Sequence, residues 1–309
     1  MFFQFDKINC VLLSKFEAMK FIQRYELNVI KWDALVESNQ AMCYHYSWYM
    51  DATAKNWAVF VNEDYSKGLA ISYNQVLGQK ILYPTLLGRT TAFLGMTLAE
   101  VELALIQLKK EFAIGHLQTD FELKNLKMEI KTYQTLENVV INKLSKRMLQ
   151  KALRNNIEIK EVLWKDSFHF IEQELAEKVS MLRGENLKKI EILFERLHER
   201  SMLKSTGIFK NNICCGVLYL VQDGKRLLYI KGAATKEIKE EGGMYLAMMQ
   251  SIDLAISSNL VFDFGGSSIP GIKRFFNGFG GKDQNYWVHS WNNAPFWFQL
   301  IRKINKIIK

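Results

Sequence analysis

Short apolar runs broken by Asn, Asp and Gly dominate residues 57–121, and this pattern predicts β-strands separated by turns. The predicted strands are 57–62, 68–73, 79–83 and 114–121. Apolar residues three or four positions apart predict helices at 32–37, at 47–55 and after Thr97. Glu100 follows Thr97 at capping-box spacing, so the third helix should begin there.

The second half repeats this order of strands, helix and strand. Its predicted strands are 205–209, 213–222, 226–233, 260–264 and 286–290, and its predicted helices are 167–179, 187–202, 243–257 and 272–277. Asp223-Gly224 is a hairpin signal. In each half the strand after the helix ends in Asp-Phe, at Asp120 and at Asp263. The repetition predicts an internal duplication of one α+β unit.

The composition is that of a globular protein, with 49% hydrophobic and 13% aromatic residues among 309 and only 3 prolines. Disordered and collagen-like classes are therefore excluded. Apolar runs such as 217–221 are far shorter than the roughly 20 residues of a membrane-spanning helix. Residues 1–6 lack the basic start of a signal peptide, so we expect a cytoplasmic protein.

Cysteine and histidine spacing favours neither a disulfide framework nor a metal site. Two of the four cysteines, Cys214 and Cys215, are adjacent in a strand-like run, where their side chains point to opposite faces. The five histidines lie far apart, and no HExxH or CxxC motif is present. We expect free thiols and no metal.

Positive charge is concentrated in one predicted helix. The chain has 41 Lys+Arg and 32 Asp+Glu, a net charge of +9, and residues 143–160 carry six basic side chains against one acidic. This helix should end near Asn155-Asn156. It could contact RNA or a polyanionic substrate, or it could be a solvated linker helix. No nucleic-acid-binding motif accompanies it.

The segment 262–281 has the densest set of chemically useful residues. Asp263 stands at the end of a predicted buried strand, and Gly265-Gly266 forms a turn before a short helix with Lys273 and Arg274. Paired glycines permit positive φ angles, and free amides at a helix start can hold an anion. Alternatively, Asp263 caps the amides of this turn.

Four motifs carry a resemblance to a known family. The segment 263–281, DFGGSSIPGIKRFFNGFGG, resembles the C-terminal signature of the Fem-like branch of the GNAT acyltransferase superfamily. That signature is a D-F-x-G-S turn followed by a helix of the type G-x-x-x-F-K-x-x-F-G. Residues 147–152 resemble the R-N-x-x-K-A helix of this branch, and residues 32–36 and 48–52 resemble its W-D-x-x-V and W-Y-L-D-A elements. The resemblance implies an α+β fold of two tandem GNAT-like units, each a mixed β-sheet flanked by helices.

We expect these units at 1–140 and 141–309. The second would include the basic connecting helix and an amphipathic C-terminal helix.

The resemblance has departures at positions where chemistry would be expected. Phe276 replaces the lysine of the F-K motif, so a substrate phosphate there would need Lys273 or Arg274. Met148 replaces the asparagine of R-N-x-x-K-A.

The loop that holds the coenzyme A pyrophosphate in many GNAT enzymes corresponds here to 239–245. Gly242, Gly243 and the helix dipole favour an anion, whereas Glu240 and Glu241 would each repel one by on the order of 1 kcal/mol. The alternative interpretation of Gly242-Gly243 is a plain strand-to-helix turn.

The resemblance implies an N-acyl or aminoacyl transferase with an amine acceptor, such as a small-molecule or lipid-linked cell-envelope precursor. The donor would be an acyl-CoA or an aminoacyl-tRNA, and no metal would be needed. The alternative is a catalytically inactive GNAT-like module that binds a glycan or cell-wall precursor.

Such a transfer needs a proton acceptor for the amine and amides that stabilise an oxyanion. We expect Asp263 to take the amine proton or orient the acceptor, Tyr286 to protonate the leaving group, and Gly232 to mark a β-bulge beside the oxyanion. The remaining expected site residues are Lys273, Arg274, Gly266, Ser267, Arg147 and Lys151 for the substrate, with Gly232, Gly242 and Gly243 for the donor.

The C-terminal residues 296–309 form a predicted amphipathic helix. Its apolar face would comprise Trp297, Leu300, Ile301, Ile304, Ile307 and Ile308, and its basic face Arg302, Lys303, Lys306 and Lys309. This helix could dock on the protein core, or it could lie on an anionic membrane and place the protein peripherally at the inner leaflet.

Overall fold

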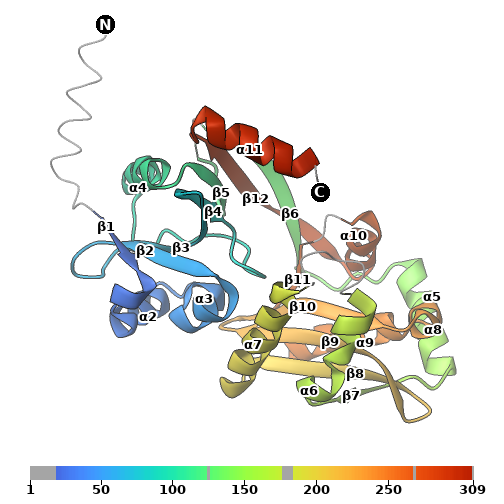
Figure 1. Ribbon diagram of the computed structural model, residues 1–309. Coiled ribbons are helices and arrows are strands. Elements are labelled where there is room, and N and C mark those ends of the chain that lie inside the picture. The colour runs from blue at the N-terminus through green and yellow to red at the C-terminus, as the bar shows by residue number, and fades with distance from the viewer. Residues whose placement is uncertain (1–18, 124–125, 176–183, 267–268, 308–309) are drawn as a thin grey trace, which may run out of the picture. The chain divides into compact units, whose positions relative to one another are not determined.

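The computed structural model describes residues 19–123, 126–175, 184–266 and 269–307, and it divides into two compact units (Figure 1). Unit 1 contains the residues up to 129 together with 287–309, and unit 2 contains 130–286. This division differs from the expected one at residues 140/141. The last 23 residues return to unit 1 because the end of a late strand, β12, pairs with β5 there.

Unit 1 is built on a sheet with the strand order β1-β2-β3-β4-β5-β12. Its strands are β1 (Lys20–Gln23), β2 (Asn56–Val61), β3 (Gly68–Val76), β4 (Gln79–Tyr83), β5 (Ile114–Thr119) and the end of β12 (Gly281–Asn292). Its helices are α2 (Val29–Ser38), α3 (Ser47–Thr53), α4 (Leu98–Glu111) and α11 (Phe296–Ile307), with short 3-10 turns at Arg24–Glu26 and Cys43–His45. Neighbouring strands are antiparallel except β4 and β5, which α4 connects in parallel.

The family-like motifs of unit 1 have structural roles. Trp32 is fully buried and donates from Nε1 to the carbonyl oxygen of His45 over 3.0 Å. Asp33 accepts hydrogen bonds from the amide and hydroxyl of Ser47, at 2.8 and 2.7 Å, and so fixes the start of α3. Asp51 accepts two hydrogen bonds from Arg24, at 2.8 and 2.9 Å. The predicted capping box of Thr97 and Glu100 is present at the start of α4.

Unit 2 has a sheet of the order β6-β11-β10-β9-β8-β7. Its strands are β6 (Lys127–Leu136), which begins in unit 1, β7 (Glu158–Glu161), β8 (Leu203–Lys210), β9 (Ile213–Asp223), β10 (Arg226–Ala234) and β11 (Val261–Gly265). Its helices are α5 (Lys143–Arg154), α6 (Trp164–Ser167), α7 (Glu185–Glu199), α8 (Lys236–Glu241), α9 (Gly243–Ser257) and α10 (Pro270–Asn277), with a π-helical turn at Ile171–Leu175.

The two units share a topology. In unit 2, α9 connects β10 to β11 in parallel, and β6 pairs antiparallel with β11. In unit 1, likewise, α4 connects β4 to β5 in parallel, and β12 pairs antiparallel with β5. The mixed α+β architecture of two units, each a mixed sheet flanked by helices, is therefore as expected; an origin by duplication stays a prediction.

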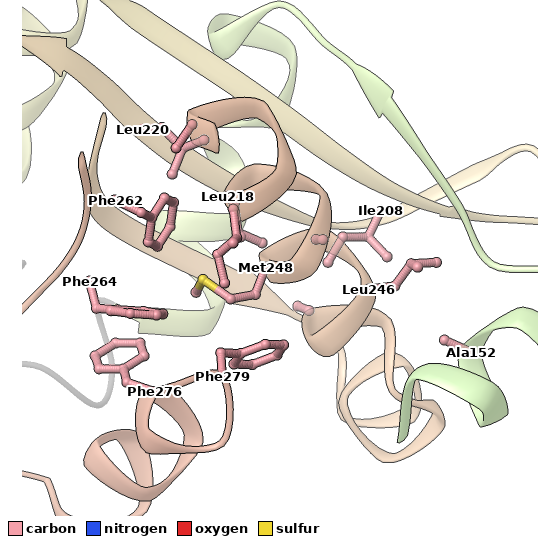
Figure 2. Close-up of a cluster of buried hydrophobic side chains, with 14 of the residues drawn as sticks. Ala152, Ile208, Leu218, Leu220, Leu246, Met248, Phe262, Phe264, Phe276 and Phe279 are labelled. Carbon is pink, nitrogen blue, oxygen red and sulfur yellow. The ribbon is translucent and has the colours of Figure 1, made fainter. Parts of the chain in front are cut away.

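The two faces of the unit 2 sheet are covered by different helices. Leu218 and Leu220 of β9 pack in one apolar cluster with α9, β11 and α10 (Figure 2). The intervening Tyr219 lies on the opposite face, 4.7 Å from the ring of Phe194 in α7. The period-2 alternation of β9 thus produces two separate apolar layers.

Several predicted elements differ from the structure. The strands β1, β6 and β7 and the helix α8 were not predicted, because their residues are largely polar or exposed and show little apolar alternation. The predicted helix 167–179 begins earlier than expected, with α6 at Trp164–Ser167, and after a turn at Phe168 it continues as helix to Leu175, with π-helical geometry at Ile171–Leu175. Residues 176–179 lie outside the described residues.

Within the described ranges, no helix is long and apolar enough to cross a membrane. The same ranges contain no group of three or more His, Cys, Asp or Glu that could hold a metal ion. Among the described residues, Cys43, Cys214 and Cys215 are not joined by a disulfide, and Cys10 lies outside these ranges.

Candidate active site

The candidate site lies where β10 and β11 separate. The two strands are paired only from Arg226/Val261 to Leu228/Asp263. Beyond this point β10 runs on to Ala234 with β9 alone as its partner among the described strands. Beyond Leu228, the edge of β10 that faces away from β9 therefore has no hydrogen-bonded partner among the described strands.

A β-bulge accompanies the separation. The register between β10 and β9 shifts between Tyr229 and Lys231, so the extra residue is Ile230 and not Gly232 as expected. Gly232 is instead required because there is no room for a side chain at its position. A Cβ at this position would lie 2.7 Å from the Tyr229 hydroxyl and 3.0 Å from Cε of Met244 in α9.

Tyr229 is a central residue that the sequence analysis did not identify. Its hydroxyl lies over Gly232 and has no hydrogen-bond partner among the described residues. Burial raises the pKa of Tyr229, so the hydroxyl keeps its proton at neutral pH. Its backbone carbonyl lies 3.1 Å from the position of a Cβ on Gly265. The residue therefore contacts the glycines of both separating strands.

Asp263 is completely buried in β11 and has protein partners on both carboxylate oxygens. Oδ1 accepts from the amide of Gly265 over 2.9 Å, and Oδ2 accepts from Nη1 of Arg226 over 3.2 Å. Gly265 has φ +70°, a conformation that favours glycine. This geometry is that of a turn cap held by an ion pair.

Gly266, Lys273 and Tyr286 are connected through β6. A Cβ on Gly266 would lie 3.2 Å from the Thr132 carbonyl. Lys273 donates to the Thr132 hydroxyl over 3.5 Å and forms an ion pair with Asp283. The ring of Tyr286 lies 6.4 Å from that of Tyr133, the next residue of β6.

The other expected residues of this segment have different surroundings. Arg274 is exposed and has no ion-pair partner among the described residues, whereas Ser267 lies outside them. Phe276 is only 2% exposed, with its ring 5.2 Å from Phe264 (Figure 2). The position of the family's lysine is thus part of the core.

Helix α5 packs against the start of α9. Gly242 has φ +91°, and a Cβ there would lie 2.2 Å from the Met148 carbonyl oxygen of α5. Lys151 donates from Nζ to the Glu240 carbonyl over 2.9 Å and so caps α8. A Cβ on Gly243 would lie 2.5 Å from Ile238. Both glycines are therefore needed for close packing, and α5 occupies the space beside Gly242.

The outer face of α5 is basic and exposed. Its exposed cations are Lys143, Lys146, Arg147, Lys151 and Arg154. All except Lys151, which caps α8, have no hydrogen bond or ion pair with the described part of the chain. Four positive charges are therefore available to a polyanion on this face.

Lys231 is a second residue that the sequence analysis missed. It follows the bulge residue of β10, lies opposite Tyr219 in β9, and has no hydrogen bond or ion pair with the described residues. Burial lowers the pKa of Lys231. A single lysine in an alternating strand gives no signal of this kind, because its burial depends on which elements pack on the strand, such as the turn at Ile171–Leu175 that contacts β10.

No family model and no curated protein matches this sequence. Solved structures do match its fold. The crystal structure of FemX aligns with TM-score 0.64 over 89% of this chain and 98% of FemX, at 12% identity. The chain shares the two-unit fold of FemX. L-PGS from Bacillus licheniformis aligns with TM-score 0.56 over 88% and 94% of the two chains at 8% identity.

A GNAT-family acetyltransferase from Colwellia psychrerythraea aligns with TM-score 0.54, over 89% and 99% of the two chains at 9% identity. The fold expected from the Fem-like motifs is therefore confirmed.

Proposed function

We propose that this chain transfers an aminoacyl or acyl group to an amine of a cell-envelope precursor. The observation that carries the proposal is the separation of β10 from β11 after Leu228/Asp263, with the unpartnered Tyr229 hydroxyl over Gly232. A strand edge without a partner offers backbone amides to an oxyanion. FemX and the C-terminal domain of a putative lysylphosphatidylglycerol synthetase from Agrobacterium fabrum share the fold, which supports an acceptor of this class.

In the proposed reaction the amine nitrogen attacks the carbonyl carbon of the donor ester or thioester. A tetrahedral oxyanion forms, the bond to the leaving oxygen or sulfur breaks, and the amine loses a proton while the leaving group gains one. The amides of β10 beyond the bulge would stabilise the oxyanion. Tyr286 or Tyr229 would protonate the leaving group, and Asp263 would hold the β11 turn that orients the acceptor.

Aminoacyl-tRNA is favoured over acyl-CoA as the donor. The carbonyl of Met148 lies against Gly242, where the pyrophosphate of coenzyme A would need the free start of α9. The outer face of α5 offers four cations, Arg147 among them, to an RNA backbone. Lys273 and Arg274 are the proposed contacts for a phosphate of the acceptor.

The test is transfer of a radiolabelled amino acid from charged tRNA to a lipid-linked or soluble amine acceptor, with acyl-CoA donors assayed in parallel. Gly232→Val should abolish transfer because its side chain would fill the space beside the Tyr229 hydroxyl. Gly224→Asn is the control, because Gly224 lies at a hairpin tip with open space around it and asparagine tolerates its φ of +54°. Absence of transfer from every donor would contradict the proposal.

The second candidate function is a binding module without catalysis. It is favoured by Asp263, whose carboxylate oxygens are both engaged, and by the buried Phe276. Tight binding of a glycan or cell-wall precursor with no transfer from any donor would support it.

A further inference from the structure

Unit 1 contains a pocket of about 500 Å³ that the proposed transferase site does not use. It is bordered by β5, β12, α11 and the first residue of β6. The lining residues are Ile114, His116, Lys127, Ser290, Trp291, Asn292, Gln299 and Arg302.

The ionisable side chains among the described residues that line this pocket are all basic. Among the described residues that line it are Lys127, Arg302 and His116, and none of these described lining residues is acidic. Lys127 and Arg302 form no ion pair or hydrogen bond with any part of the chain that the structure describes. The sequence after Asp283 contains no acidic residue at all. Two cations from different elements therefore face one pocket without a counter-charge, which attracts an anion.

One wall of the pocket is apolar and firmly held. Trp291 is 8% exposed and donates from Nε1 to the Phe112 carbonyl over 2.9 Å. Its ring covers Gly115 so closely that a Cβ there would lie 2.1 Å from Cζ2. Gln299 is fixed by a 2.7 Å hydrogen bond from Nε2 to the Ala294 carbonyl. Trp291 and Gln299 are thus held in place before any ligand arrives.

We propose that this pocket binds a phosphate ester, with the phosphate between Lys127 and Arg302 and the attached group against Trp291. A phosphate offers three acceptor oxygens, which suits two cationic side chains with Ser290 and Asn292 beside them. The proposal does not depend on the transferase function, because no residue of unit 2 takes part.

The phosphate could belong to a soluble ester or to a lipid headgroup. Helix α11, which supplies Gln299 and Arg302, also exposes Phe296, Trp297, Leu300 and Ile301, with exposed fractions of 81%, 47%, 48% and 36%. An apolar surface on the helix that borders the pocket is suited to a bilayer. The experiment therefore has one arm for each source.

In the first arm, phenyl phosphate is titrated into the full chain by calorimetry. Saturable binding is expected, with the dissociation constant raised about tenfold by Arg302→Gln and by Lys127→Gln, as for loss of a hydrogen bond to a charged group. Arg302→Lys and Lys127→Arg should largely retain binding. Lys110→Gln, an exposed charge on α4, is the matched control and should bind as the unchanged chain does.

In the second arm, the chain is sedimented with phosphatidylglycerol or phosphatidylcholine vesicles, with and without phenyl phosphate. Competition by phenyl phosphate against phosphatidylglycerol would assign the phosphate to a lipid, and binding without competition would assign it to a soluble ester. If neither phenyl phosphate nor vesicle binding depends on Lys127 and Arg302, the proposal is wrong. Transferase activity is measured separately, so its absence leaves this result unaffected.

Discussion

Arg226 and Asp263 form an ion pair, 3.2 Å between Nη1 and Oδ2, within the short stretch where β10 and β11 are still paired. Asp263 is fully buried, whereas the Arg226 side chain is 37% exposed. A buried carboxylate that keeps such a partner holds the two strands in register up to the point where they separate. Its role is then to position the turn at Gly265 and, through it, the candidate site.

Asp263→Asn should lower the free energy of unfolding by about 1–3 kcal/mol, because the Arg226 charge loses its partner. Transfer should fall, but the pH dependence of the remaining activity should not change, since a positioning residue does not exchange the proton. Chemical denaturation and pH–rate profiles of both proteins test this. Loss of activity with unchanged stability would instead make Asp263 the proton acceptor.

This relationship shows how far the sequence predicts the site. Asp263, Gly266 and Lys273 were predicted from one local motif, and Tyr286 was predicted at the start of the next strand. The structure connects Gly266, Lys273 and Tyr286 through β6. The partner Arg226 was not predicted, because it lies 37 residues from Asp263 in the sequence and strand pairing at that separation leaves no local signal.

The same limit applies to other parts of the fold. Helix α9 was predicted at its observed bounds, Gly243–Ser257. The bulge at Ile230 and the burial of Lys231 depend on the register with β9 and on packing across the sheet. Neither follows from residue spacing alone.

Lys231→Met should stabilise the protein at neutral pH. Burial lowers the pKa of Lys231, so between that pKa and the ordinary value of 10.5 the unfolded chain binds more protons, and stability rises with pH. The advantage of the variant should therefore shrink toward pH 10. Lys225→Met, on the exposed hairpin, is the control.

Thermal unfolding from pH 7 to 10 gives this difference directly. A concurrent loss of transfer in Lys231→Met would show that the buried charge is kept for function. Destabilisation at neutral pH would show that the ammonium has a partner and that the expected direction is wrong.

Arg274→Ala should weaken binding of a phosphorylated acceptor more than Lys273→Ala does. Arg274 is exposed without an ion pair among the described residues, whereas Lys273 already pairs with Asp283. The loss should shrink as salt is raised, because exposed charges are screened. Affinities at low and high salt test the order, and unchanged low-salt affinity in Arg274→Ala would remove this residue from the site.

Acid should destabilise unit 1 through His45. Burial lowers the pKa of His45 to about 3, so the unfolded chain binds more protons below pH 6.5 and stability falls as the pH decreases toward 3. At pH 5 this costs about 2 kcal/mol. His45→Gln should remove that part of the difference in unfolding free energy between pH 8 and pH 5. An unchanged difference would show that other groups cause the acid sensitivity.

Within its described part, helix α11 has Phe298 in the core and a separate exposed face that could contact a membrane. Phe298 is completely buried with Ile114 and Ala294, so Phe298→Ala should cost about 3–5 kcal/mol of stability. Trp297 and Leu300 lie on the predicted apolar face and are about half exposed, at 47% and 48%. Replacing both with Ser should leave thermal stability nearly unchanged.

Vesicle sedimentation then tests the exposed face. The unchanged chain should pellet with anionic vesicles at low salt, because the four cations of residues 302–309 lie close to this face in the sequence and each adds about 1 kcal/mol on anionic lipid. The Trp297→Ser, Leu300→Ser variant should remain in the supernatant, whereas the exposed control Lys110→Gln should pellet. If the double variant pellets equally well, the membrane does not contact this face. If it unfolds, the face belongs to the core, as the first interpretation of this helix requires.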